Sequence, residues 1–255
     1  MLDPQRVKRE YDSIAVEYNS QYVASPVGAL EYELTGIALG DLTGRTVLDL
    51  GGGSGIHARQ AVDLGAAAVD IVDLSPGMMK VAEESEKATG RNVMRFFEAD
   101  VAKPLSHLPL REEGYDVVMA NWVLDFADSA EVLEGMFHNI VGYLKSGGLF
   151  VGVRLGNPHS TILQTGQYGV ILKDMEPFPG GVKFRAVIMS EPPMEFDAAT
   201  HDALSSDSPE VYEKAGLTSV EVIPSTAGSV VEKDPKYWAD FLKEPWLAVV
   251  KAVKK

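Results

Sequence analysis

The sequence predicts an α/β fold built on one mostly parallel sheet with helices on both faces. Between residues 44 and 154, short apolar runs of strand length alternate with segments whose apolar residues recur at helical spacing. Each run ends in a polar or glycine-rich turn. Strands that are joined through helices run parallel, because the helix carries the chain back to the edge of the sheet where the strand began.

Two helices are predicted before the first strand. Residues 3–20 place Tyr11, Ile14 and Tyr18 on one face at helical spacing. A second helix is expected over residues 26–39, because its first residue is a proline, which suits the first turn of a helix.

Seven strands are expected in the sheet, with further helices between them. The predicted strands are residues 46–50, 67–73, 93–98, 115–120, 149–154, 219–223 and 247–253. The helices that follow the first strand are predicted over residues 56–64, 76–88, 128–145 and 209–215. The segment 155–206 has no regular pattern, apart from residues 183–189 and 194–196, which are predicted to pair as a hairpin.

A glycine-rich turn follows the first strand, where Asp49, Gly51, Gly53 and Gly55 form the pattern Asp-x-Gly-x-Gly-x-Gly. Such a turn presents backbone N–H groups and the positive end of a helix dipole, which favours a nucleotide-like ligand. The third glycine of a dinucleotide fingerprint falls on Ile56, and the Gly-Lys-Ser/Thr ending of a P-loop is absent, so neither motif applies. The alternative is a glycine-rich connector without a ligand.

Composition narrows the class of protein. The length of 255 residues and the hydrophobic content of 45% predict one domain with a sizeable core. We expect a monomer or a homodimer, and the sequence does not decide between them. The net charge of −14 opposes binding to nucleic acid, and the absence of cysteine excludes disulfides and thiolate metal sites. No apolar run approaches the roughly 18 residues of a membrane span. Residues 1–6 lack the apolar segment of a signal peptide, so we expect a cytoplasmic protein.

The glycine turn resembles the first motif of the class I S-adenosylmethionine-dependent methyltransferases. The order of polar residues after it (Asp73, Asp100, Asn121 and the turn at residues 145–148) is similar to the core of that family across residues 44–154. The resemblance implies a Rossmann-like seven-stranded sheet. It also implies one methyltransferase domain with four parts: an N-terminal helical lid (1–43), the cofactor-binding core (44–154), an insertion over the acceptor (155–206) and the end of the sheet (207–255).

The resemblance implies S-adenosyl-L-methionine as cofactor and a role for each strand end. Asp49 suits the ammonium group of the cofactor. Asp73, which lies 24 positions after Asp49, is expected to bind the ribose hydroxyls, or else to stabilise the turn before the next helix. Leu74 and Met78 are expected to hold the adenine, or to be ordinary packing residues.

Other strand ends and the first helix complete the expected site. Asp100, next to Val101, accepts the adenine amino group or merely caps its turn. Asn121 and Trp122 form a floor for the methionine arm and a planar acceptor, or are a turn residue and a core residue. Tyr11 and Tyr18 close the site around the sulfonium, or simply pack a docking helix.

The expected reaction is an in-line displacement in which an acceptor atom attacks the methyl carbon. A base is needed only when the acceptor holds a proton of high pKa. His159, which lies just after the fifth strand, is the first candidate for this base. The alternative is that His159 is a loop residue without a catalytic role. Trp122 is the second candidate catalytic residue. His201 is the next candidate. No metal-ligand spacing supports a metal-dependent mechanism.

Several stretches look like the enzymes that N-methylate the heterocycle toxoflavin, among them residues 120–129 and 192–196. This resemblance favours methyl transfer to an N or O atom of a small aromatic or heterocyclic metabolite of secondary metabolism. Two alternatives stay open. One is a relative that binds the cofactor without methyl transfer, acting as a cyclase or a regulatory partner. The other is a protein methyltransferase.

Overall fold

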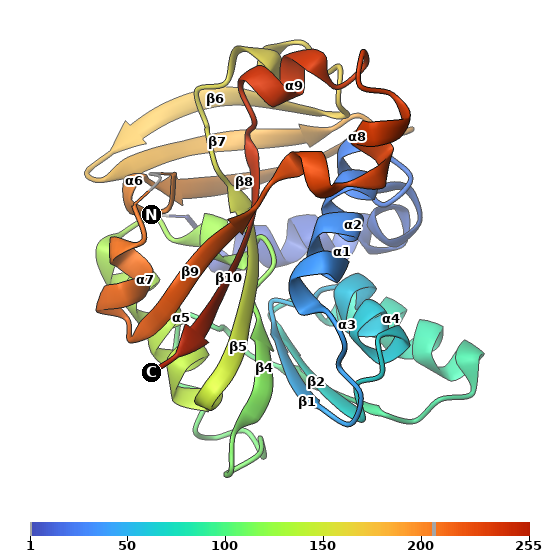
Figure 1. Ribbon diagram of the computed structural model, residues 1–255, viewed down its shortest axis with the longest axis vertical. Coiled ribbons are helices and arrows are strands. Elements are labelled where there is room, and N and C mark those ends of the chain that lie inside the picture. Colours follow the sequence, from blue (N-terminus) through green and yellow to red (C-terminus); the bar gives the residue numbers. More distant parts are fainter. Residues whose placement is uncertain (1, 206–207) are drawn as a thin grey trace.

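Seven strands form the main sheet of the protein in the order β3-β2-β1-β4-β5-β10-β9 (Figure 1). The computed structural model describes residues 2–205 and 208–255. The main-sheet strands are β1 (Thr46–Leu50), β2 (Ala68–Asp73), β3 (Met94–Glu98), β4 (Tyr115–Met119), β5 (Leu144–Leu155), β9 (Leu217–Ile223) and β10 (Leu247–Lys254). The strands β1 to β5 pair in parallel, whereas β10 is antiparallel to both β5 and β9. The predicted fold class is therefore confirmed.

Helices lie on both faces of this sheet. The longer ones are α1 (Pro4–Gln21), α2 (Pro26–Leu39), α3 (Ile56–Asp63), α4 (Pro76–Thr89) and α5 (Ala130–Tyr143). The short ones are α6 (Asp202–Ser205), α7 (Glu210–Lys214), α8 (Ser229–Lys233) and α9 (Ala239–Lys243), with 3-10 turns η1 (Val123–Phe126), η2 (Thr161–Gln164) and η3 (Ser225–Ala227).

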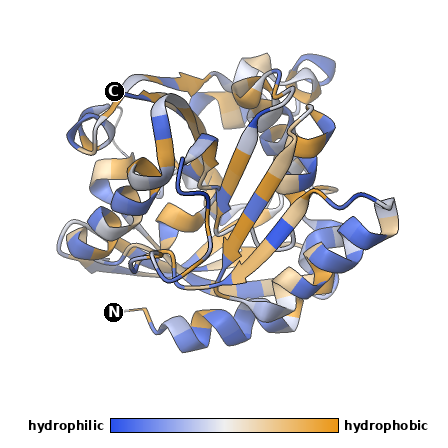
Figure 2. Cartoon of the chain, turned by 90° about the horizontal axis from the view of Figure 1, so that it is seen from below, coloured by the Kyte–Doolittle hydropathy of each residue, from blue (hydrophilic) through white to orange (hydrophobic). Residues whose placement is uncertain are grey.

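Successive residues of β1 belong to different cores, as strand geometry requires. Val47 packs in a core with α2 and α3, and Leu48 packs in a second core with α5 and α7. Figure 2 shows apolar central strands, and on α1, the helix next to the N label, mostly hydrophilic residues. No helix among the described residues is both long enough and apolar enough to cross a bilayer.

A second sheet of three antiparallel strands lies across one end of the main sheet (Figure 1). It consists of β6 (Val170–Phe178), β7 (Gly181–Ile188) and β8 (Met194–His201), and we call it the cover sheet. The predicted hairpin is confirmed as β7 and β8. Apolar residues of all three strands share one core with α2 and α3, so the cover sheet is packed onto the main domain.

The strands β6 and β5 differ from the sequence prediction, and the short helices α6, α8 and α9 were not predicted. The strand β6 was not predicted, because its residues alternate weakly in polarity and pair only with β7. The strand β5 begins at Leu144, five residues earlier than expected, and runs through the predicted turn at residues 145–148. A register shift opposite β4 and a positive φ at Gly147 let the strand continue there, as in a β-bulge. The predicted boundary between the insertion and the end of the sheet falls on residues 206 and 207, outside the described residues.

The helix α1 lies between α4 and the cover sheet. On one side, the Asp12 carboxylate accepts hydrogen bonds from the Ser75 hydroxyl (2.6 Å) and from the backbone N–H of Gly77 (2.8 Å) at the start of α4. On the other side, Glu10 accepts from Arg185 of β7 (3.1 Å) and from the N–H of Asp197 of β8 (3.0 Å). These contacts hold α1 across the carboxyl ends of the parallel strands, where ligands of α/β sheets bind.

Candidate functional site

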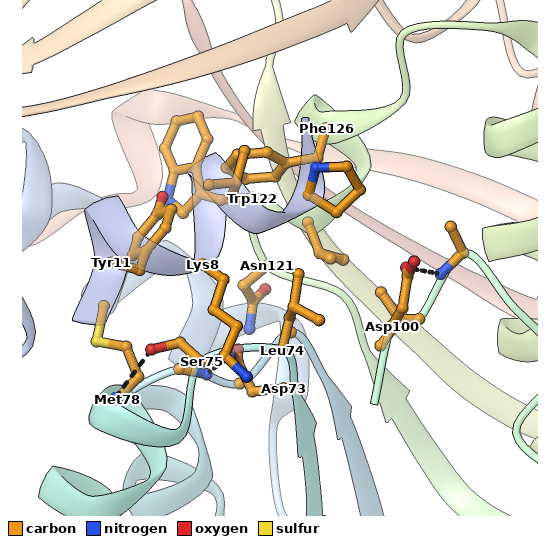
Figure 3. A pocket seen from close by; sticks show the side chains of 18 of the residues that line it. Lys8, Tyr11, Asp73, Leu74, Ser75, Met78, Asp100, Asn121, Trp122 and Phe126 are labelled. Carbon is orange, nitrogen blue, oxygen red and sulfur yellow. Dashed lines mark hydrogen bonds between the residues drawn. The ribbon is translucent and has the colours of Figure 1, made fainter. Parts of the chain in front are cut away.

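A cavity of about 470 Å³ lies beneath α1 at the carboxyl ends of β1, β2 and β4 (Figure 3). In Figure 3, Tyr11, Trp122 and Phe126 lie on one side of it, and Asp73 and Leu74 lie opposite. The predicted site residues that line this main cavity are Tyr11, Tyr18, Asp49, Gly51, Gly53, Asp73, Leu74, Met78, Asp100, Val101, Asn121 and Trp122. Residues that are far apart in the sequence thus meet at one place, as expected from the topology.

The glycine turn forms one wall of the main cavity. Gly51 has a φ of +71°, and a Cβ atom there would lie 2.6 Å from the side chain of Val123, so only glycine fits. The N–H of Gly53 donates to Oδ2 of Asp73 (2.8 Å). Gly55 has a left-handed backbone and forms the N-cap of α3, but it does not line the cavity. Its role is to start the helix.

Asp49 is a buried carboxylate near the end of β1. It is 1% exposed, and neither of its oxygens has a hydrogen-bond partner in the described part of the chain. Burial raises the pKa of Asp49 to about 7; the positive charge of His57 opposes this rise and the negative charge of Asp73 adds to it. Since an unpaired buried charge is costly, a cationic ligand group at this strand end would stabilise the site. The ammonium group of S-adenosylmethionine fits that requirement.

Asp73 has the turn-stabilising role that was one of the two alternatives from the sequence. Its oxygens accept hydrogen bonds from the N–H groups of Gly53 and Ser75, both at 2.8 Å, so it fixes the glycine turn and the start of α4. Burial raises the pKa of Asp73, and these backbone N–H groups and that of Leu74 oppose the rise. A carboxylate oxygen has lone pairs for two hydrogen bonds, so each oxygen of Asp73 can accept one more, from a hydroxyl group for example.

Asp100 and Asn121 differ in what their side chains already contact. The Asp100 carboxylate accepts from the N–H of Ala102 (3.0 Å) and pairs with Lys103 (3.2 Å), so it caps its turn while it lines the cavity. By contrast, neither the oxygen nor the nitrogen of the buried Asn121 amide has a partner among the described residues. Asn121 therefore has both an acceptor and a donor left for a ligand.

A buried hydrogen-bond network fixes Trp122, and sequence reasoning missed its centre, Glu31. The Glu31 carboxylate, 1% exposed, accepts hydrogen bonds from the Trp122 indole (2.8 Å), from His57 Nε2 (2.8 Å) and from the Tyr22 hydroxyl. Trp122 has a φ of +62°, a conformation that costs about 1–3 kcal/mol in a non-glycine residue and is found at ligand sites. The signal available in the sequence was a pair of acids, Glu31 and Glu33, in an otherwise apolar helix.

His57 of α3, which the sequence analysis did not name as a site residue, lines the main cavity. Its Nδ1 atom lies 3.0 Å from the side-chain oxygen of Gln60, so both ring nitrogens face oxygen acceptors. Burial opposes the charged ring, yet the hydrogen bond and charge of Glu31, together with Gln60 and Asp49, raise the pKa of His57. The arrangement favours an imidazolium ion beside the cavity.

A smaller cavity of about 60 Å³ lies between α1, η1, β5 and the cover sheet. Apolar and aromatic side chains form nearly all of its wall. Asp125 of η1 is the only carboxylate among the described residues that line it, and the sequence analysis did not single it out.

The structure does not bring the predicted histidines to either cavity. His159 is exposed, and it lines neither cavity in the part of the chain that the structure describes; its backbone N–H donates to the Asn157 side chain (3.1 Å). His201 lies at the end of β8 and lines a separate surface pocket between α5 and α7. The geometry therefore gives no support for either imidazole as the base. The described residues contain no group of three or more His, Asp or Glu side chains that would hold a metal ion.

Comparisons with known proteins agree with this geometry. Residues 48–152 match the family model described as a methyltransferase domain. An S-adenosylmethionine-dependent methyltransferase from Mesorhizobium loti superposes with a TM-score of 0.61 at 19% identity, over 89% of this chain and 99% of that one. The structure titled DhpI-SAM-HEP complex superposes with a TM-score of 0.61 at 17% identity, over 98% of this chain and 99% of that one.

The matches to curated proteins are shorter. The ribosomal protein L11 methyltransferase of Alteromonas mediterranea is 37% identical over 111 residues, which is 44% of this chain and 34% of that protein. This chain spans between 32% and 61% of the length of four curated relatives. The fold is that of the class I methyltransferases. Within it, residues 48–152 are the part of the chain that is similar to the methyltransferase-domain family.

Proposed function

We propose that the protein transfers the methyl group of S-adenosyl-L-methionine to an N or O atom of a small, planar aromatic or heterocyclic acceptor. The observation that carries this proposal is the pair of carboxylates, Asp49 and Asp73, on either side of the glycine turn in one cavity. The Asp49 oxygens have no hydrogen-bond partner in the part of the chain that the structure describes, and Asp73 holds the turn while it keeps free lone pairs. A cationic amino acid group and a ribose diol suit these two carboxylates.

The residues of this chain would bind and orient the reactants. The bound cofactor supplies a methyl group on a positively charged sulfur, which is already activated for displacement. Asp49 binds the ammonium group, Asp73 the ribose hydroxyls, and Asn121 the polar groups of the methionine arm. Trp122, fixed by Glu31, and the tyrosines of α1 exclude water from the reacting atoms.

A small acceptor is favoured by the position of the cover sheet and α1. Beneath them, aromatic side chains such as Tyr11, Tyr18 and Trp122 line the main cavity, and this lining suits a flat ring better than a polypeptide chain. The resemblance of residues 120–129 and 192–196 to toxoflavin N-methylating enzymes supports a heterocycle. The printed name of the Alteromonas relative makes a protein acceptor the second candidate.

The test is calorimetric titration with S-adenosylhomocysteine and with its 2′,3′-dideoxy analogue. We expect one saturable site and a clear preference for the parent ligand. An Asp73→Asn variant should lose that preference, because the one remaining carboxamide oxygen is held by the glycine turn. Thermal unfolding of the variant, beside an Asp240→Asn control on the exposed surface of α9, reports whether the turn itself has collapsed.

No binding of either ligand by the unmutated protein would overturn the proposed function. Binding of the homocysteine product without turnover of any acceptor in a screen of heterocycles, phenols and basic peptides would point to a cofactor-binding protein that does not transfer methyl groups. Turnover of peptides alone would favour the second candidate.

A further inference from the structure

The centre of the main cavity carries two acids close to each other. Asp49 near the end of β1 and Asp73 at the end of β2 both line it. Asp73 is held by the backbone N–H groups of Gly53 and Ser75, and it forms no ion pair with a described residue. The negative charge of Asp73 contributes to the raised pKa of Asp49, so the two carboxylates repel each other.

The cations that line the same cavity are each paired with an acid. Among the described residues these cations are Lys8, His57 and Lys103. Lys8 and Lys103 form ion pairs with acids at the end of β3 and just after it. His57, whose charge acts on Asp49, lies with its Nε2 atom 2.8 Å from the Glu31 carboxylate. When all three are ionised, Glu31, His57 and Asp49 together carry one negative charge, so His57 does not neutralise the centre of the cavity.

The other acids of the lining contribute little at the centre. Asp128, just before α5, lies 3.5 Å from the ammonium group of Lys183. Glu131, in the first turn of α5, is exposed, so water and salt screen its charge. The negative charge that remains in the middle of the main cavity is therefore that of Asp49 and Asp73.

Aromatic side chains give the main cavity a second preference for positive charge. Tyr11, Tyr18 and Trp122 line it. In Figure 3, Tyr11 and Trp122 lie on the side opposite Asp73. The indole N–H of Trp122 donates to Glu31 (2.8 Å), so the ring presents only carbon atoms to the cavity. The face of an aromatic ring attracts a cation that lies within about 6 Å of the ring centre.

We propose that the main cavity selects the positively charged sulfonium of the cofactor over the neutral thioether of S-adenosylhomocysteine, through the charges of Asp49 and Asp73 and the aromatic ring of Trp122. This inference rests on the proposed function. The amino acid part of both ligands carries one positive and one negative charge, so it leaves the net charge of the cavity unchanged. Only the sulfonium adds a positive charge to the two carboxylates, and opposite charges attract strongly where little water is present.

Methyl transfer removes the feature that the cavity recognises. The electron pair of the acceptor atom forms the bond to the methyl carbon, the methyl–sulfur bond breaks, and its electron pair stays on sulfur. The positive charge passes to the acceptor, which releases a proton to water, and the cofactor becomes a neutral thioether. Since the cavity binds that thioether more weakly than the sulfonium, the protein should be only weakly inhibited by its own product.

The test is calorimetry at pH 8 with three ligands that share the adenosine and the amino acid part. S-adenosylmethionine carries the sulfonium, S-adenosylhomocysteine has a neutral sulfur, and sinefungin has a protonated amine in place of the sulfonium and its methyl group. The unmutated protein should bind S-adenosylmethionine and sinefungin at least about tenfold more tightly than S-adenosylhomocysteine. At this pH Asp49 is mostly ionised, because its pKa is raised to about 7.

Three variants assign the preference to its source. Asp49→Asn removes one of the two charges at nearly the same volume and should reduce the preference to about threefold. Trp122→Leu removes the aromatic ring, leaves both carboxylates and should also reduce the preference to about threefold. Glu84→Gln, on the exposed surface of α4, is the matched control and should keep the full preference, because water screens that charge. Thermal unfolding checks that each variant folds, and Trp122→Leu carries the test if Asp49→Asn does not.

The inference is overturned if the unmutated protein binds S-adenosylhomocysteine as tightly as S-adenosylmethionine. It is also overturned if sinefungin binds only as tightly as S-adenosylhomocysteine, because the methyl group rather than the charge would then be recognised. A preference that is unchanged in both Asp49→Asn and Trp122→Leu would overturn its assignment to these residues. Failure of the proposed function has a different signature, which is that the unmutated protein binds none of the three ligands.

Discussion

Asp49 makes a quantitative prediction about the pH dependence of cofactor binding. Its pKa is raised to about 7 by burial, and its oxygens have no partner in the described structure. If Asp49 binds the ammonium group, only its ionised form binds well, so protons compete with the ligand. Affinity should therefore fall as the pH is lowered through the pKa of the free protein, and the pKa of Asp49 should return towards its ordinary value in the complex.

The size of the effect follows from the fraction of Asp49 that is ionised. That fraction is about one half at pH 7 and about one per cent at pH 5, so the Kd should rise about fiftyfold between these two values. The α-amino group of the ligand stays protonated over most of this range, because its ordinary pKa lies near 8. The titration of the ligand therefore contributes little.

The assay is calorimetry with S-adenosylhomocysteine from pH 5 to pH 8, on the unmutated protein and on Asp49→Asn. S-adenosylhomocysteine lacks the sulfonium charge, so the ammonium is its one cation. The variant should bind more weakly at pH 8 and should show little pH dependence, apart from any contribution of His57. A Kd that stays constant from pH 5 to pH 8, or a slope that is the same in Asp49→Asn, would refute the ionic role of Asp49.

Three further predictions concern the surroundings of the site. Glu31→Gln removes the charge that His57 and the Trp122 indole contact, so it should lower the free energy of unfolding, measured in urea, by about 1–3 kcal/mol and weaken cofactor binding. An unchanged free energy of unfolding would show that the network does not stabilise the fold. Asp12→Ala removes two hydrogen bonds between α1 and the start of α4, so limited proteolysis should cut within α1 faster in the variant than in the unmutated protein, while the rest of the domain stays resistant. If the variant and the unmutated protein are cut at equal rates, these hydrogen bonds do not hold α1 in place. His159→Ala should leave kcat within about twofold, because the exposed imidazole lies outside both cavities, and a loss of tenfold or more would restore it as the base.

Local sequence patterns were sufficient to predict the parts of the site whose residues are consecutive in the chain. The Asp49 to Gly55 turn was recognised because strand, glycines and helix are consecutive, and positive φ angles at those glycines are a local requirement. Asp73 and Asn121 were found by the same reasoning, since each ends a strand whose apolar run is visible in the sequence. The parallel order of the strands then places all their carboxyl ends at one edge.

The other parts of the site depend on contacts between residues that are far apart in the sequence, and the sequence did not predict them. Glu31 lies in a segment whose pattern predicts only an apolar helix, and its partners His57 and Trp122 come from other elements. Asp125 lies in a turn, and the cavity that it lines is formed by several other elements. His159 follows a strand just as Asn121 does, but its loop leads to the surface. Strand β6 has little pattern of its own and exists because β7 offers it hydrogen-bond partners.

The sequence by itself determined the fold class, the positions of the parallel strands along the chain and the glycine-rich turn with its two acids. These depend on periodicity, turn chemistry and spacing, which act over a few residues at a time. Only the tertiary structure decided which acid lacks a partner, which histidine is buried and where an acceptor fits. Those properties depend on what surrounds a side chain, because burial and the absence of a hydrogen-bond partner arise from elements that the chain brings together only when it folds.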